Sequence, residues 1–121
     1  MKLIPVIDLF AGPGGLGEGF SSITNQNGDP LFKIGLSIEK DPNARKTLVL
    51  RAFFRQFRKD RAPQDYYDYL AGKIPRTELW ARYKAEAKAA ESEAWHAELG
   101  GDSTSDELID ERISETYLQL A

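Results

Sequence analysis

The stretch DLFAGPGGLGEGF, residues 8–20, joins an apolar segment to a helical pattern through a loop that carries almost no side chains. The preceding run LIPVI, residues 3–7, is rich in β-branched residues and predicts a buried parallel strand. Pro5 has no N–H, so that side of the strand is expected to be unpaired or at an edge. Glycines accept positive φ and let another molecule approach the main chain. We therefore expect a ligand to lie against the backbone of this loop.

A β-α-β unit is predicted from the next residues. Leu16, Phe20 and Ile23 recur at helical spacing, and the apolar run 34–38 predicts a second strand that leads directly into Glu39. Because the crossover in such a unit is right-handed, Glu39 is expected beside the glycine loop. A carboxylate there can accept both hydrogen bonds of a ribose diol, which suits an adenosine.

Two nucleotide cofactors fit this pattern. Gly12, Gly14 and Gly17 satisfy G-x-G-x-x-G, with Glu39 22 residues after Gly17, so an oxidoreductase fragment that binds NAD is one interpretation. Asp8, at the end of the first predicted strand, favours another ligand, because its carboxylate would repel a pyrophosphate and attract a cation. S-adenosylmethionine carries an ammonium and a sulfonium. It is therefore the preferred candidate.

Residues 8–20 and 37–41 resemble the first motifs of the cytosine-5 DNA methyltransferases, in which DLFxGxGG is followed by a small or apolar residue and an aromatic. The resemblance implies that Phe10 packs on the adenine and that the loop backbone lines the methionine part. It also implies that Glu39 holds the ribose hydroxyls and that Asp41 lies near the adenine edge, while Lys40 offers only its aliphatic stem. The implied cofactor-binding residues are Asp8, Phe10, Ala11, Gly12, Gly14, Gly15, Leu16, Glu39, Lys40 and Asp41.

The same resemblance indicates what the chain does not contain. The family adds a thiolate from a Pro-Cys motif to carbon 6 of cytosine, and this sequence has no cysteine. Neither the later Glu-Asn-Val motif nor a target-recognition region is found. We therefore expect the cofactor-binding portion of a DNA methyltransferase, of the kind found in restriction-modification systems, which is inactive without its catalytic half.

The predicted fold class is α/β, a truncated Rossmann-like methyltransferase fold with two parallel strands and a mostly helical insertion. Residues 1–61 are assigned to the cofactor-binding β-α-β-α portion and residues 62–121 to the helical extension. Two strands leave sheet edges unpaired, so a missing C-terminal half or self-association is expected to cover them. A helical interaction module that keeps only a relic of the site is the third interpretation.

Asp41 and Pro42 predict the start of a helix, as its N-cap and first residue, with Leu50, Phe53, Phe54 and Phe57 on the buried side. Basic residues cluster on this helix and could steer DNA phosphates, although a solvated helix face is the preferred interpretation. They are Arg45, Lys46, Arg51, Arg55, Arg58, Lys59 and Arg61.

Beyond residue 61 only helices are predicted. Gln64 to Ala71 carries Tyr66, Tyr67 and Tyr69, which are expected to pack between helices and less readily to stack on unpaired bases. A long alanine-rich helix is predicted from Pro75 to Leu99, although Trp80, Trp95 and Leu99 fall off its apolar stripe. Thr104 and Glu107 predict a capping box for a last helix.

Composition is ordinary for a globular protein, with 41% hydrophobic residues and a net charge of -3. No hydrophobic run reaches membrane length and no secretion signal is recognised, so we expect a cytoplasmic protein without membrane contact. The single histidine, His96, has no neighbouring cysteine or second histidine, so no metal site is expected. DNA is the expected partner of the complete enzyme.

Overall fold

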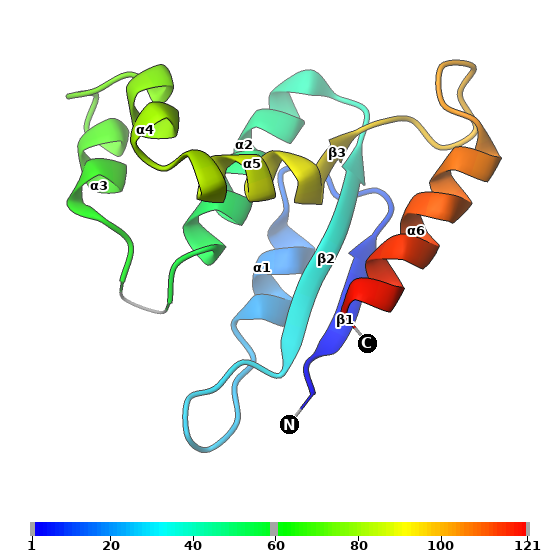
Figure 1. The fold of residues 1–121 in the computed structure, drawn as a ribbon, viewed down its shortest axis with the longest axis horizontal. Coiled ribbons are helices and arrows are strands. Elements are labelled where there is room, and N and C mark those ends of the chain that lie inside the picture. Colours follow the sequence, from blue (N-terminus) through cyan, green and yellow to red (C-terminus); the bar gives the residue numbers. More distant parts are fainter. Residues whose placement is uncertain (1, 59–60, 121) are drawn as a thin grey trace.

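The computed structural model describes residues 2–58 and 61–120. Three parallel strands form one sheet in the order β1-β2-β3, with β1 (Ile4–Asp8) and β3 (Ala94–His96) on either side of β2 (Phe32–Glu39). Helices lie against the sheet, as Figure 1 shows. The α/β class is confirmed, and the arrangement is compatible with a Rossmann-like fold.

Pro5 lies at a position in β1 where no backbone N–H is needed for pairing with β2. The N–H of Ile4 donates to the carbonyl of Leu31 at 2.9 Å, so Ile4 points its donor toward β2. Successive residues of a strand point their N–H groups to opposite sides, so the Pro5 nitrogen faces away from β2. Among the described residues no strand pairs with that outer edge. The predicted edge position of Pro5 is therefore confirmed for this part of the chain.

The third strand was not predicted, and the long helix predicted from Pro75 to Leu99 is wrong. The segment instead divides into α4 (Arg76–Arg82), α5 (Lys84–Glu93) and β3. β3 pairs in parallel with residues 37–39 of β2. The alanines of residues 75–99 fit helical periodicity throughout. The pairing of β3 with β2, which is a tertiary contact, therefore decides the local conformation.

Helices cover both faces of the sheet (Figure 1). On one side lie α1 (Gly15–Ser21) and α2 (Pro42–Arg55), and on the other lies α6 (Asp106–Leu120), while α3 (Gln64–Leu70) and α4 stand farther from the strands. The sheet is thus the middle layer, and its two faces have separate apolar clusters. Residues 2–58 and 61–120 include no helix both long and apolar enough to span a membrane.

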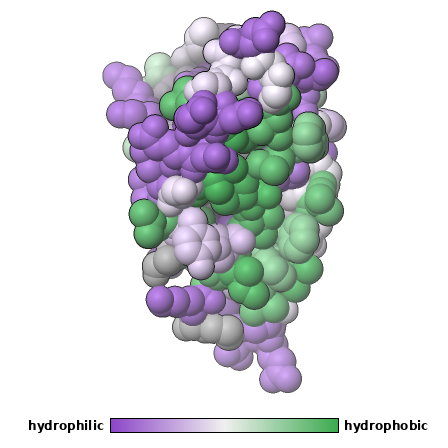
Figure 2. Space-filling view, turned by 90° about the vertical axis from the view of Figure 1, so that its right-hand side faces the viewer, coloured by the Kyte–Doolittle hydropathy of each residue, from purple (hydrophilic) through white to green (hydrophobic). Residues whose placement is uncertain are grey.

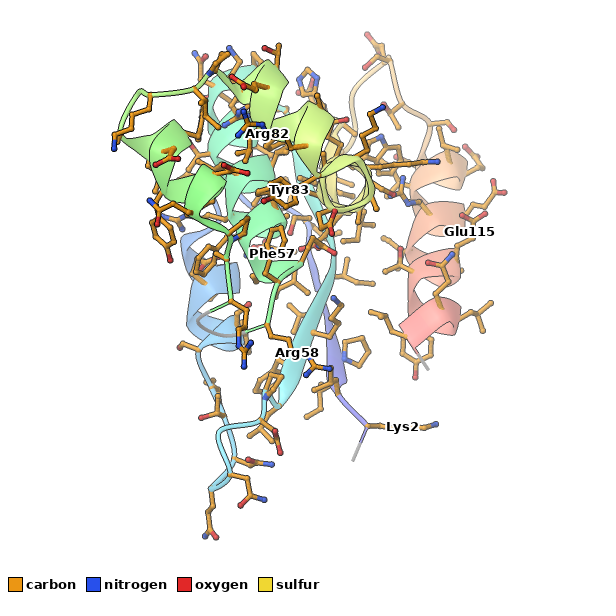
Figure 3. All side chains as sticks on the ribbon, turned by 60° about the vertical axis from the view of Figure 1, so that its left-hand side comes forward. Lys2, Phe57, Arg58, Arg82, Tyr83 and Glu115 are labelled. Carbon is orange, nitrogen blue, oxygen red and sulfur yellow. The ribbon has the colours of Figure 1, made fainter. Side chains whose placement is uncertain are left out.

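The buried side of α2 differs from the predicted one. Leu48, Val49, Ala52 and Phe53 are buried, whereas Phe54 remains 36% exposed. Of the predicted stripe, Phe53 is fully buried, while Leu50 and Phe57 are half-buried. Figure 3 shows Phe57 and Tyr83 turned toward each other between α2 and the α4–α5 junction, and their rings meet edge to face at a centroid distance of 5.7 Å.

The helices α3 and α6 test two further predictions. Tyr66 and Tyr69 of α3 pack against the cluster around Phe53, as predicted, but Tyr67 is 46% exposed. The predicted cap of the last helix is off by one residue, because the hydroxyl of Ser105, not Thr104, accepts a hydrogen bond from the N–H of Leu108 at 3.2 Å. The residue that caps a helix depends on the local backbone conformation, and sequence spacing predicts the position of a helix end only to within one or two residues.

Gly35 lets α6 lie close to the sheet. A β-carbon built on Gly35 would clash with Leu120 Cδ1 and would lie 2.7 Å from Thr116 Cγ2. We expect Gly35→Ala to lower the free energy of unfolding by about 1–3 kcal/mol, because α6 must shift outward. Chemical denaturation measures the effect.

Gly19→Ala is the matched control, since a β-carbon there meets nothing within 4 Å. In the interior of α1 it should be neutral or stabilise by up to about 1 kcal/mol. Equal destabilisation by the two changes would show that α6 does not constrain Gly35.

Candidate cofactor site

The glycine loop after β1 is folded so that most of its backbone stays open. Gly12 and Gly14 have φ of 57° and 97°, in the left-handed region that favours glycine. A β-carbon on Gly14 would lie 2.9 Å from Leu48 Cδ1, so α2 packs directly against this point. No atom lies within 4 Å of a β-carbon built on Gly12 or Gly15, which leaves these two positions accessible to another molecule.

Glu39 lies beside this loop, as the sequence predicted. The N–H of Gly12 donates to Glu39 Oε1 at 2.8 Å, and the N–H of Asp41 donates to Oε2 at 2.8 Å. The carboxylate therefore links the loop after β1 to the turn after β2. Each carboxylate oxygen can accept a second hydrogen bond, so Glu39 can still receive two hydroxyl groups.

Asp41 serves as the N-cap of α2. Its Oδ1 accepts a hydrogen bond from the N–H of Asn43 at 3.1 Å, and Pro42 occupies the first helical position. The predicted cap is thus confirmed. Its implied place near an adenine stays a prediction. The capping bond occupies one of its two carboxylate oxygens.

A shallow pocket of about 130 Å³ lies where β2 and β3 end. It is smaller than most complete small-molecule sites, which measure roughly 300–1,000 Å³. Phe10 stands at its border with 80% of its surface exposed, so its ring face is free. The lining residues are Leu9, Phe10, Ile38, Glu39, Lys40, Ala97, Glu98 and Leu99.

The structure thus brings most of the implied residues together at one edge of the sheet. Ala11 is buried and its N–H donates to the Ile38 carbonyl at 3.0 Å, so it anchors the loop. Leu16 is 66% exposed on α1, and Asp8 ends β1 opposite Ser37. Neither of these two side chains lines the pocket itself.

Sequence reasoning missed the wall of the pocket formed by Ala97, Glu98 and Leu99. These residues follow β3, which was interpreted as helix. The signal was present, because Trp95 and Leu99 did not fit the helical stripe. The side chains of residues 94–97 are in turn buried, half-buried, exposed and buried, and it is their pairing with β2 that identifies the strand.

Polar contacts join the turns after β2 and β3. The backbone carbonyl of Lys40 accepts a hydrogen bond from His96 Nε2 at 2.8 Å, so that nitrogen carries the hydrogen. Lys40 Nζ lies 3.7 Å from Glu98 Oε1. Both side chains are more than half exposed, so this ion pair is weak and a ligand can displace it.

The basic residues of α2 have several different roles. Arg45 donates from Nε to the Ala94 carbonyl at 2.9 Å and so holds the junction of α5 and β3. Arg55 binds carboxylates inside the fold. These two do not form part of a continuous basic face for DNA. Lys59, which was counted in the cluster, lies outside the described residues.

Arg55 connects the helix after the glycine loop to the helix before β3. Its Nη1 pairs with Glu18 Oε1 of α1 and its Nη2 lies 2.6 Å from Glu93 Oε1 of α5. Gln56 also donates to Glu93, at 3.4 Å. Burial raises the pKa of Glu93 above its usual value of 4.5, although Arg55 and Lys33 partly oppose the rise.

This raised pKa predicts a specific pH dependence. The folded state holds the Glu93 proton more tightly than the unfolded state, so stability falls as the pH rises from about 4.5 through the raised pKa. Glu93→Gln cannot ionise and should remove that decline. Urea denaturation of both proteins across this range measures the difference, and identical pH profiles would show that Glu93 is not the responsible group.

The described residues hold no group of three or more His, Cys, Asp or Glu side chains placed to bind a metal ion. Comparisons of the chain with protein-family models, with curated proteins and with solved structures found no match.

Proposed function

We propose that the chain binds S-adenosylmethionine at the carboxyl edge of its sheet and is the cofactor-binding portion of a cytosine-5 DNA methyltransferase. The observation that carries the proposal is the 2.8 Å hydrogen bond between the Gly12 N–H and Glu39 Oε1. It joins an open glycine loop to an acid that follows the next strand. Ligands of open α/β sheets bind in the crevice outside the carboxyl ends of the strands.

The site offers a separate environment for each part of the cofactor. Glu39 would accept the ribose hydroxyls, with the adenine in the pocket against Phe10 and its exocyclic amine toward the Glu98 carboxylate. The methionine part would lie over the backbone of Gly12 and Gly15, where no side chain stands in the way. Asp8 would favour the positive charge of the sulfonium.

The packing of Gly17 does not distinguish a dinucleotide from S-adenosylmethionine. In G-x-G-x-x-G sites the third glycine permits close approach of helix and strand. A β-carbon on Gly17 would lie 3.8 Å from Ile34 Cδ1, an ordinary van der Waals contact. Alanine would fit there, and the dinucleotide pattern accepts alanine at this position, so the preference for S-adenosylmethionine rests on Asp8.

The methyl transfer itself requires a group from another polypeptide segment. These 121 residues contain no cysteine, so the thiolate that would add to carbon 6 of cytosine must be supplied elsewhere. The outer edge of β1, unpaired among the described residues, is where we propose that such a segment adds a strand. Figure 2 shows apolar residues gathered on the side of the molecule that bears α6, and Ile4 of β1 is 55% exposed.

We therefore expect the isolated chain to transfer no methyl group to DNA. Incubation with tritium-labelled S-adenosylmethionine and cytosine-containing duplex, followed by counting of the DNA, measures this. Incorporation above the no-enzyme background would contradict the proposed division of labour, because it would require a nucleophile other than cysteine.

Calorimetric titration tests the cofactor. We expect heat of binding with S-adenosylmethionine and with S-adenosylhomocysteine, which shares the adenosyl and amino-acid parts, and none with NAD. Binding of NAD without binding of either adenosyl ligand would reverse the assignment.

A further inference from the structure

An aromatic surface lies on α2 and α3. The rings of Phe54 and Tyr66 have centroids 5.2 Å apart, and those of Tyr66 and Tyr67 are also 5.2 Å apart, at an interplanar angle of 82°. Phe54 and Tyr67 are 36% and 46% exposed. Tyr66 packs against the cluster around Phe53, whereas the exposed parts of Phe54 and Tyr67 extend beyond it.

Arg51 connects this surface to the glycine loop. Its Nη1 would lie 3.9 Å from a β-carbon on Gly14, and its charge acts on the hydroxyl of Tyr66. The neighbouring Arg45 and Arg55 are held by carbonyl or carboxylate groups. The Arg51 side chain makes no hydrogen bond or ion pair with another described residue. Its guanidinium is therefore available to an anion from outside.

We propose that Arg51, Phe54, Tyr66 and Tyr67 form a binding surface for single-stranded nucleic acid. Bases stack on exposed aromatic rings, and an arginine beside the rings binds the phosphate that links them. A duplex hides its base faces, so it cannot use the rings.

The charge distribution supports this partner over a protein. Residues 1–61 contain ten Lys and Arg against six Asp and Glu, although the whole chain has a net charge of -3. The excess of positive charge thus lies in the half that carries Arg51 and Phe54, whereas Asp65 and Asp68 flank the two tyrosines on α3. The inference takes DNA as the nucleic acid from the proposed function, but its physical basis does not depend on the cofactor.

Fluorescence anisotropy with a labelled oligothymidine of about twelve nucleotides tests the surface, since one such site spans roughly 4–16 nucleotides. We expect the oligothymidine to bind more tightly than a duplex of equal length. Tyr67→Ala should weaken binding by about 5-fold or more, the usual loss when one stacked base is released. Arg51→Gln should also weaken binding, because a contact between the guanidinium and a phosphate is lost. Tyr67 is half exposed, so its replacement leaves folding intact.

Lys88→Gln on α5 is the control, because it removes one exposed positive charge elsewhere and should change affinity less than about 2-fold. Equal losses for the three variants, unchanged binding by Tyr67→Ala, or preference for duplex would each overturn the proposal. Titration of the same variants with S-adenosylhomocysteine separates the two proposals. If the wild type does not bind the cofactor, but Tyr67→Ala and Arg51→Gln still lose oligothymidine binding, this surface is supported. Only the cofactor assignment is then contradicted.

Discussion

Replacing Arg55 by methionine is expected to lower the free energy of unfolding at neutral pH by about 3–5 kcal/mol, because it leaves a buried carboxylate without its counter-ion. The Arg55 and Glu93 side chains are only 17% and 8% exposed, so water cannot substitute for the guanidinium. Such a loss is a large part of the stability of a small domain. The loss should shrink as the pH falls, because a protonated Glu93 needs no counter-ion. Urea denaturation at several pH values measures it.

Two comparison proteins show whether charge causes the loss. Lys46→Met removes an exposed charge from the same helix and should change stability by no more than about 0.5 kcal/mol. Adding Glu93→Gln and Glu18→Gln to Arg55→Met should recover much of the loss, since no buried charge then remains. Failure of the triple variant to recover any stability would indicate that Arg55 acts through packing alone.

Replacing Glu39 by alanine should weaken S-adenosylmethionine binding by about 1.5–3 kcal/mol, or roughly 10- to 140-fold, the range for hydrogen bonds to a charged group. The expected loss has two sources. The ribose hydroxyls lose their acceptor, and the N–H groups of Gly12 and Asp41 lose the carboxylate that orders the loop. Calorimetric titration of both proteins with the cofactor gives the ratio of dissociation constants.

Glu39→Gln separates these two sources. Its amide oxygen can still accept from one of the two N–H groups, so we expect an affinity between those of the wild type and Glu39→Ala. Asp110→Asn is the matched control, because it removes an exposed carboxylate of α6 that does not line the pocket, and it should leave affinity nearly unchanged. An unchanged dissociation constant in Glu39→Ala would show that Glu39 holds the loop but not the ligand.

The sequence predicted the first half of the fold well because its signals there are local. Two β-branched runs, a glycine loop and the Asp41-Pro42 start of a helix each specify one element through nearest neighbours. β3 has no comparable signal. Ala94, Trp95 and His96 become a strand because they lie beside Ser37, Ile38 and Glu39, and because Arg45 holds the end of α5 from a distant part of the chain.

The candidate site also has a part that the sequence predicted and a part that it did not. The proximity of Glu39 and Gly12 could be predicted from the sequence, because strand–helix–strand geometry determines where the second strand ends relative to the first. The third wall of the pocket, from Ala97 to Leu99, could not, since it depends on the unpredicted strand. Nor did spacing reveal Arg55 between Glu18 and Glu93, because that contact joins three helices.

The central claim is that an adenosyl ligand lies across the ends of β1, β2 and β3, and amide chemical-shift mapping tests it most directly. On titration of the ¹⁵N-labelled chain with S-adenosylhomocysteine, the shifts should change at Gly12, Gly15 and Glu39 and at residues 97–99, with little change at Lys33 and Gly35 near the opposite end of β2. Changes confined to that opposite end, or none at saturating ligand, would contradict the account.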